Sequence, residues 1–289
     1  MTMYRYVVAD VFTDVPLQGN QVAVFTDGTG LAGEVMQRAA RELNLSETVF
    51  VLRSEGPDAH LRVRIFTPTV ELPFAGHPIL GTAFVIGRAM GSPVVRLETG
   101  LGVVPVTLTR PDGGGEPVYG EMEQFVPAVE EFSAPGELLA ALGVPGDREG
   151  LLPIEAYRNG PVHVYVELPS EEAVAALRPD IGAIERLGVY GINCFCAAGS
   201  GDRFKTRMFG PALGVAEDPG TGSAAGPLAV HLARHGRVPF GTEIEIVQGV
   251  EIGRRCVLRA RVEGTADAIG GVFVGGSAVI VARGEYRLG

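Results

Sequence analysis

The sequence has few of the residues that mark several large classes of protein. It contains no tryptophan, one lysine (Lys205) and three cysteines (Cys194, Cys196 and Cys256). Three cysteines do not make the paired framework of a small disulfide-rich protein, and such usage is typical of a reducing compartment. A pyridoxal-phosphate enzyme needs a lysine for its Schiff base, which only Lys205 could supply. We therefore expect a cytoplasmic protein that does not use this cofactor.

Long apolar runs and positive charge are also scarce. No stretch approaches the ~18 consecutive apolar residues of a membrane-spanning helix, and the opening MTMYRYVVADVF lacks the pattern of a signal peptide. The formal net charge of -10 comes without a basic block, which argues against a nucleic-acid partner. A hydrophobic content of 46% is typical of a globular protein, and 289 residues give room for two domains.

Glycine is abundant, with 41 residues, and the hydrophobic pattern predicts short strands separated by turns, with few helices. The predicted strands are 4–12, 20–25, 48–53, 60–67, two within 94–108, 163–168, 191–199, 242–249, 254–264 and 277–288. The predicted helices are 30–46, 79–91, 134–144, 170–188 and 223–236. The glycine-rich segment 110–117 is expected to be a hairpin tip or a domain edge.

Two segments of the chain resemble each other. Residues 64–83 read RIFTPTVELPFAGHPILGTA, and residues 207–225 read RMFGPALGVAEDPGTGSAA. Both run from arginine through phenylalanine and proline to a glycine turn and a small-residue helix start, so that Pro68 corresponds to Pro211 and Gly76 to Gly220. The first amide groups of a helix lack intrahelical partners and favour anions. The repeat therefore predicts two similar halves that together bind a small ligand carrying a carboxylate.

Four ordered motifs carry a resemblance to a known family. They are DVFTDVPLQGNQVAVF, NLSETVFV, the first repeat segment and EDPGTGSAAG. With these the chain resembles the PhzF-like phenazine-biosynthesis family of isomerases, which shares its fold with diaminopimelate epimerase. The resemblance implies an α+β fold of two pseudo-symmetric domains, each a curved, mainly antiparallel sheet or barrel around a central helix. The expected domains are 1–115, which the C-terminal strand 277–289 can complete, and 116–276, with the active site in the cleft between them.

The resemblance also implies roles for individual residues. It places the acid–base glutamate at Glu47, the histidine of a Gly-His-Pro motif at His77, and Asp-Pro and Gly-Ser positions at Asp218, Gly222 and Ser223. No cofactor is implied, and a homodimer is expected. The predicted catalytic residues are Glu47, His77 and Asp218, and the predicted substrate-binding residues are Asn20, Ser46, Gly76, Gly220, Thr221, Gly222 and Ser223, with Gln21 as a further polar contact. Gly220 departs from the family pattern, which usually has a non-glycine residue there, and this puts the rigidity of the loop in question.

The residues themselves restrict the chemistry. Epimerases of this fold place a cysteine before the glycine of each turn, whereas this chain has Ala75 and Pro219 at those places. Proton transfer must then use carboxylate, imidazole or hydroxyl groups. A single base at Glu47 predicts an isomerase that moves a proton within a small amino or hydroxy acid, such as a dihydro-hydroxyanthranilate-like compound. Two alternatives stay open: a racemase or epimerase that adds His77 or Asp218 as second base, and a small-acid binding protein or hydrolase.

Three other patterns suggest different functions. The segment GTGLAG (28–33) fits a dinucleotide-binding fingerprint, but the strands upstream look antiparallel and glycine is common in this chain. His231 and His235 lie one helical turn apart, as metal ligands can, but without the glutamate of an H-E-x-x-H motif. Ser223 with His77 could form a hydrolase pair, but the G-x-S-x-G motif is absent. We expect none of these functions.

Overall fold

The structure is a computed structural model, and it describes residues 2–112, 114–188, 191–199 and 201–288. The chain forms two compact units. Unit 1 comprises Met1–Gln124 and Phe273–Gly289, and unit 2 comprises Phe125–Val272. Where the sequence places a division at 115/116, the compact units divide at 124/125. Among the described residues, no helix is both long and apolar enough to cross a membrane.

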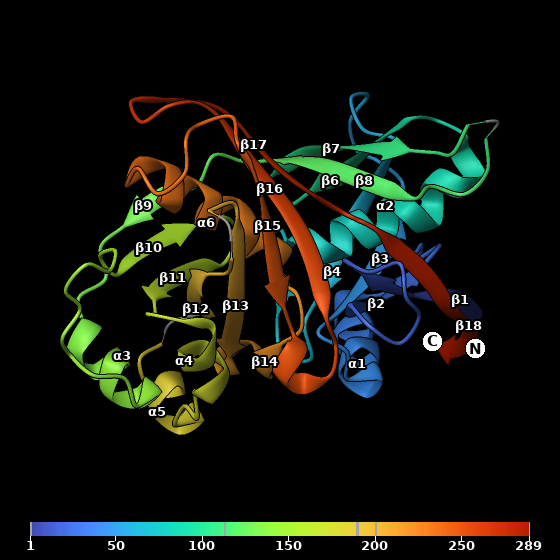
Figure 1. Ribbon diagram of the computed structural model, residues 1–289. Helices are drawn as coiled ribbons and strands as arrows, with labels where there is room; N and C mark the ends of the chain where they lie inside the picture. Colours follow the sequence, from blue (N-terminus) through green and yellow to red (C-terminus); the bar gives the residue numbers. More distant parts are fainter. Residues whose placement is uncertain (1, 113, 189–190, 200, 289) are drawn as a thin grey trace. The chain divides into compact units, whose positions relative to one another are not determined.

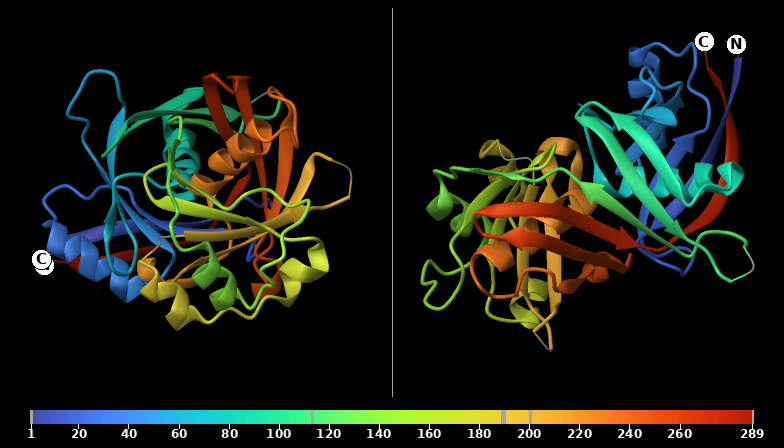
Figure 2. Two further views of the ribbon diagram at one scale, coloured as in Figure 1. Left: turned by 90° about the vertical axis from the view of Figure 1, so that its left-hand side faces the viewer. Right: turned by 90° about the horizontal axis from the view of Figure 1, so that it is seen from above.

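Unit 1 is a sheet-rich unit with one long buried helix (Figure 1). Its elements are β1 (Thr2–Val11), β2 (Asn20–Phe25), α1 (Gly33–Leu43), β3 (Glu47–Leu52), β4 (Leu61–Phe66), β5 (Glu71–Leu72), α2 (Gly76–Met90), β6 (Val94–Thr99), β7 (Gly102–Thr109), β8 (Tyr119–Gln124) and β18 (Ala278–Leu288). Strand β1 pairs antiparallel with β2 and β18, so that Thr2 lies opposite Leu288 and both chain ends lie in this unit (Figure 2). Strands β6, β7 and β8 form an antiparallel meander.

Helix α2 is the core of unit 1. Most of its first three turns are buried, and it packs against β1, β2, β6 and β7. Gly81 permits close approach to the sheet, because a Cβ there would lie 2.6 Å from Cγ1 of Val22. This packing holds the start of α2 against β2 and β3, which are parallel neighbours.

Unit 2 repeats this plan with α6 as its buried helix (Figure 1). Its elements are β9 (Ala128–Glu130), α3 (Pro135–Leu142), β10 (Glu155–Arg158), β11 (Val162–Glu167), α4 (Glu171–Ala176), α5 (Ile181–Arg186), β12 (Gly191–Ala197), β13 (Arg203–Gly210), the 3₁₀ turn η1 (Pro211–Leu213), β14 (Val215–Asp218), α6 (Gly222–Arg234), β15 (Glu243–Gln248), the 3₁₀ turn η2 (Val250–Ile252), β16 (Cys256–Thr265) and β17 (Ala268–Gly276), whose last residues belong to unit 1.

The strand pairings of the two units correspond one by one. In unit 1 the relations are β1–β2 antiparallel, β2–β3 parallel, β3–β4 antiparallel and β4–β6 parallel. In unit 2 they are β10–β11 antiparallel, β11–β12 parallel, β12–β13 antiparallel and β13–β15 parallel. The predicted α+β fold with two pseudo-symmetric halves, each around a buried helix, is therefore confirmed.

The repeated arginine and phenylalanine have the same structural role in both units. Arg64 of β4 makes two hydrogen bonds to Glu71 and lies 5.1 Å above the Phe66 ring. Arg207 of β13 makes two hydrogen bonds to Glu217 and lies 5.0 Å above the Phe209 ring. By helix start, however, Gly76 corresponds to Gly222 and not to the predicted Gly220.

Several sequence predictions need correction. The predicted helix 170–188 is two short helices, α4 and α5, because Pro179 disfavours helical backbone at the residue before it. Strands β1 and β2, upstream of GTGLAG, are antiparallel as expected, whereas β2 and β3, which flank that segment, are parallel. Strands β8, β9, β10, β13 and β17 were not predicted as such. The 110–117 segment connects β7 to β8, so it is a hairpin tip, with residue 113 outside the described part.

Candidate functional site

The predicted residues of unit 1 gather at one edge of its sheet. Asn20 is the first residue of β2, and Glu47 is the first residue of β3. Because these strands are parallel, both residues lie at the same edge. Helix α1 ends at Leu43, and Asn44, in the left-handed conformation with φ 52°, turns the chain back toward β3.

His77 lies between these residues: it is hydrogen-bonded to Asn20 and lies close to Glu47. The Asn20 side-chain amide donates to His77 Nδ1 at 3.2 Å, so Nδ1 accepts and a ring proton lies on Nε2. His77 Nε2 lies 3.2 Å from the carbonyl oxygen of Gln21 and 3.3 Å from Oε2 of Glu47. Asn20 thus favours the tautomer in which His77 Nε2 donates to the Gln21 carbonyl and presents its N–H close to the carboxylate of Glu47.

The environment of these residues is buried. The exposed fraction of His77 is 2%, and that of the Glu47 side chain is 12%. His77 lies in the first turn of α2 and packs inside the unit. Ser46 and Gly76 directly precede Glu47 and His77, and Gly76 is buried while Ser46 is half-buried.

The predicted Asp218 of unit 2 ends β14 and is fixed by its own loop. The Thr221 hydroxyl donates to Oδ2 of Asp218 at 2.6 Å. Gln248, at the end of β15, donates from Nε2 to the carbonyl oxygen of Asp218 at 2.8 Å and to Thr221 Oγ1 at 3.0 Å, and its Oε1 accepts from the Thr221 amide at 3.3 Å. Gln248 therefore holds both ends of the segment that contains Gly220, and no sequence motif indicated it.

Helix α6 begins at Gly222 and Ser223, next to this loop. Pro227 has no N–H to donate to the carbonyl four residues before it, which is that of Ser223. The Asn159 side chain donates to this carbonyl at 3.4 Å and replaces the missing bond. The sequence GSAAGP can therefore start a helix here without leaving the Ser223 carbonyl unsatisfied.

Ser223 also contacts a histidine that the sequence did not indicate. His163 Nε2 lies 3.0 Å from Ser223 Oγ, and His163 Nδ1 lies 3.3 Å from the side-chain amide nitrogen of Asn193. His163 is completely buried, and this burial lowers its pKa to about 3. The imidazole is neutral at physiological pH. In the sequence, His163 is a single histidine at the start of the predicted strand HVYVEL, and no motif around it indicates a function.

Two of the cysteines are core residues. Cys194 and Cys196 lie on β12 and belong to the core cluster of unit 2. Burial raises the pKa of the Cys194 thiol to about 12 and that of the Cys196 thiol to about 11. Both are therefore protonated thiols and not nucleophiles or bases.

His231 and His235 lie on one face of α6, together with Glu155 of β10, and their ligand-type atoms are within 4.8 Å of one another. Oε2 of Glu155 already interacts with several groups: the Tyr157 hydroxyl at 2.6 Å, the two histidines at 3.2 and 3.1 Å, and Arg234 at 3.5 Å. Although burial opposes the shift, the hydrogen bonds from Tyr157 and His235 lower the pKa of Glu155 to about 2.

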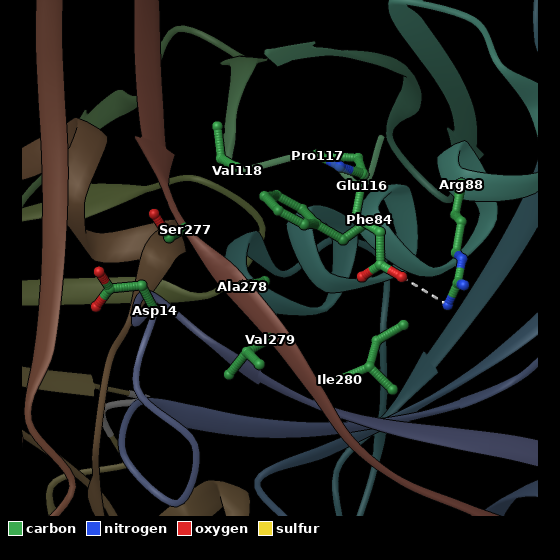
Figure 3. A pocket seen from close by; sticks show the side chains of 10 residues that line it. All are labelled: Asp14, Phe84, Arg88, Glu116, Pro117, Val118, Ser277, Ala278, Val279 and Ile280. Atoms are coloured by element: carbon green, nitrogen blue, oxygen red, sulfur yellow. Dashed lines mark ion pairs between the residues drawn. The ribbon is translucent and has the colours of Figure 1, made fainter. Parts of the chain in front are cut away.

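A pocket of about 300 Å³ lies on unit 1, away from the predicted residues (Figure 3). Its lining residues are Asp14, Phe84, Arg88, Glu116–Val118 and Ser277–Ile280. Arg88 and Glu116 point toward each other across one end and form a 2.8 Å ion pair, with both side chains more than half exposed. None of the predicted site residues lines this pocket.

Comparison with known proteins shows the family to which the chain is similar. The profile of a family described as phenazine biosynthesis-like protein matches residues 9–284. A Pseudomonas aeruginosa protein named trans-2,3-dihydro-3-hydroxyanthranilate isomerase is 53% identical over 286 residues, which cover 99% of this chain and 100% of that protein. The crystal structure of a Bacillus anthracis phenazine biosynthesis protein of the PhzF family matches with a TM-score of 0.84 and 26% identity, covering 100% of each chain.

A more distant structure shares the fold alone. It is a hydroxyproline epimerase from Agrobacterium vitis, with a TM-score of 0.70 and 14% identity over 98% of this chain and 92% of that one.

Proposed function

Because the chain belongs to the phenazine biosynthesis-like family and is an isomerase, we propose that its substrate is trans-2,3-dihydro-3-hydroxyanthranilate or a close analogue. The observation that carries this proposal is the 53% identity to a protein of that name, which extends over 99% of the chain. Identity at this level over the full length supports a common substrate as well as a common reaction type.

Glu47 is the proposed acid–base group. Its carboxylate takes a proton from one carbon of the substrate and returns it to another carbon of the same conjugated system. The proton balance is zero and no electrons leave the substrate, so the proposed reaction uses no cofactor. The 3.3 Å distance between His77 Nε2 and Oε2 of Glu47 supports this role, because a polar N–H group this close to the carboxylate can orient it toward the substrate.

The remaining predicted residues are proposed to bind the same substrate. His77 and Asp218 polarise its amino and hydroxyl groups, and the helix start at Gly222 and Ser223 binds its carboxylate. Smaller binding roles are proposed for Asn20, Ser46, Gly76, Gly220 and Thr221. The rigid hydrogen bonding of the Asp218 loop to Gln248 supports a fixed geometry despite the flexibility of Gly220.

A cytoplasmic homodimer is the proposed cellular form. Three free, buried cysteines are typical of a reducing compartment. The family resemblance supports the dimer. Light scattering coupled to size-exclusion chromatography would measure twice the chain mass for a dimer and the single-chain mass for a monomer.

Proton NMR in deuterated water tests the reaction. The wild-type protein is expected to isomerise the compound and to incorporate deuterium, whereas Glu47→Gln should lose about 10²–10⁴-fold in kcat, the usual size of an acid–base contribution. Because the amide is isosteric, ligand affinity should change little. Glu34→Gln, at an exposed position in α1, is the matched control and should keep full activity.

Other outcomes have definite meanings. Deuterium exchange at a stereocentre without isomerisation would favour a racemase. Binding without exchange in the wild type would favour a binding protein. Full turnover by Glu47→Gln would remove Glu47 from the proposed mechanism.

A further inference from the structure

Ser223 is the last member of a buried chain of hydrogen bonds in unit 2. The chain runs from the Asn193 side-chain amide to His163 Nδ1 at 3.3 Å, and from His163 Nε2 to Ser223 Oγ at 3.0 Å. Exposed fractions are 2% for Asn193, 0% for His163 and 4% for Ser223. These contacts come from three elements, β12, β11 and α6, which the sheet and its buried helix bring together.

The direction of these hydrogen bonds follows from the first donor. An amide nitrogen can only donate, so Nδ1 of His163 accepts and its ring proton lies on Nε2. His163 therefore donates to Ser223 Oγ, and the serine hydroxyl proton stays available for another acceptor. The dipole of α6, a helix of 13 residues, favours a negatively charged acceptor at this end.

This polarity is opposite to that of a serine nucleophile. In a catalytic triad the histidine must accept the serine proton, and a carboxylate behind it stabilises the imidazolium. Here an amide lies in the third position and burial lowers the pKa of His163 to about 3, so the imidazole cannot act as a base near neutral pH. The arrangement makes Ser223 a hydrogen-bond donor instead of a nucleophile.

A similar pair occurs in unit 1, but its histidine belongs to the buried helix α2 and its asparagine to β2. There an asparagine amide also donates to histidine Nδ1, and the Nε2 proton lies near the carboxylate of Glu47. Gly191 is the first residue of β12, as Glu47 is of β3, and it lies opposite His163. A Cβ at Gly191 would lie 2.6 Å from His163 Nδ1, so only glycine leaves room for this imidazole.

We propose that His163 and Asn193 are positioning residues that fix the Ser223 hydroxyl as a hydrogen-bond donor to the carboxylate of the substrate. This inference rests on the proposed function, because it assigns Ser223 to an anthranilate-type acid. It adds two residues, neither of which touches the ligand, to the proposed site.

A double-mutant cycle tests the inference with two stable probes. 3-Hydroxyanthranilate carries the carboxylate, and 2-aminophenol is the same ring without it. We expect Ser223→Ala and His163→Leu each to raise the Kd for 3-hydroxyanthranilate about tenfold, with no change for 2-aminophenol, since one hydrogen bond to a charged group is lost. The double variant should bind like Ser223→Ala alone, because His163 acts through Ser223. Additive losses, or an unchanged Kd in His163→Leu, would overturn the proposal.

Two further measurements keep the test independent of folding and of the substrate. His163→Gln retains an amide donor, and it should restore most of the affinity lost in His163→Leu. Nitrogen-15 NMR of the ligand-free wild type should show the Nε2-protonated tautomer for His163, and the Nδ1-protonated tautomer would refute the proposed polarity. If the wild type shows the expected tautomer but binds neither probe, the proposed substrate class fails while the hydrogen-bond polarity stands.

Discussion

The Asp218 carboxylate is oriented by one neighbouring hydroxyl group. Thr221 donates to its Oδ2 at 2.6 Å, and Gln248 in turn donates to Thr221 Oγ1 at 3.0 Å. The EDPGTGS motif indicated Asp218 and Thr221, which are close in sequence. It could not indicate Gln248, which is 30 residues from Asp218 and reaches the loop only because β15 lies in the same unit.

Removal of this hydroxyl is expected to reduce catalysis. Thr221→Val preserves side-chain volume but removes the donor to Asp218, and we expect a fall of about tenfold in kcat/KM from the loss of one charge-assisted hydrogen bond. Thr206→Val is the matched control, because Thr206 bonds to Gln248 at 3.2 Å but no hydrogen bond joins it to Asp218. Steady-state kinetics decide the matter, and equal effects of the two variants would contradict the assigned role of Thr221.

At the scale of secondary-structure elements, the repeat places an arginine–glutamate pair before the turn that leads into each buried helix, α2 and α6. The sequence predicted the repeated arginine and the turn that follows it. It did not reveal that the two pairs differ in burial: the side-chain exposures are 25% and 41% for Arg64 and Glu71, but 7% and 13% for Arg207 and Glu217. Arg207 also donates to the carbonyl of Leu177 at the end of α4, which ties that helix to β13.

The two pairs should therefore contribute unequally to stability. Glu217→Gln leaves a buried guanidinium without its counter-charge, and we expect the free energy of unfolding to fall by about 3 kcal/mol. Glu71→Gln removes the more exposed ion pair, with Arg64, and should lower the free energy of unfolding by less than about 1 kcal/mol. Urea denaturation followed by circular dichroism measures both. A larger effect at Glu71 would show that burial does not decide the difference.

At the scale of the whole molecule, buried neutral histidines connect stability to pH. Burial lowers the pKa of His163 to about 3 and that of His231 to about 4, whereas an unfolded chain has the ordinary value of about 6.5. Between these values the unfolded chain binds more protons, so the free energy of unfolding rises with pH. This stability is fully present above pH 6.5 or so and is lost as the pH falls toward 4.

The expected loss is up to about 1.4 kcal/mol per pH unit for each histidine. Urea midpoints at pH 7, 6 and 5 should therefore fall steeply. His163→Gln should remove about half of this dependence and leave the contribution of His231. Equal slopes for the variant and the wild type would mean that His163 is not a neutral buried group in the folded protein.

The sequence by itself determined the α+β class, the duplicated strand–turn–helix plan, and the candidate residues Glu47, His77, Asp218 and Ser223. The duplicated plan follows from local patterns, because turns, helix starts and hydrophobic periodicity depend on neighbouring residues. The α+β class and the four candidate residues follow from the resemblance of the motifs to the PhzF-like family. Only the tertiary structure decided that Asn20 fixes the tautomer of His77, that Gln248 holds the Asp218 loop, and that Asn193 and His163 support Ser223. Those contacts join strands and helices far apart in the chain, and a hydrogen bond depends on distance and direction in the folded protein and not on sequence separation.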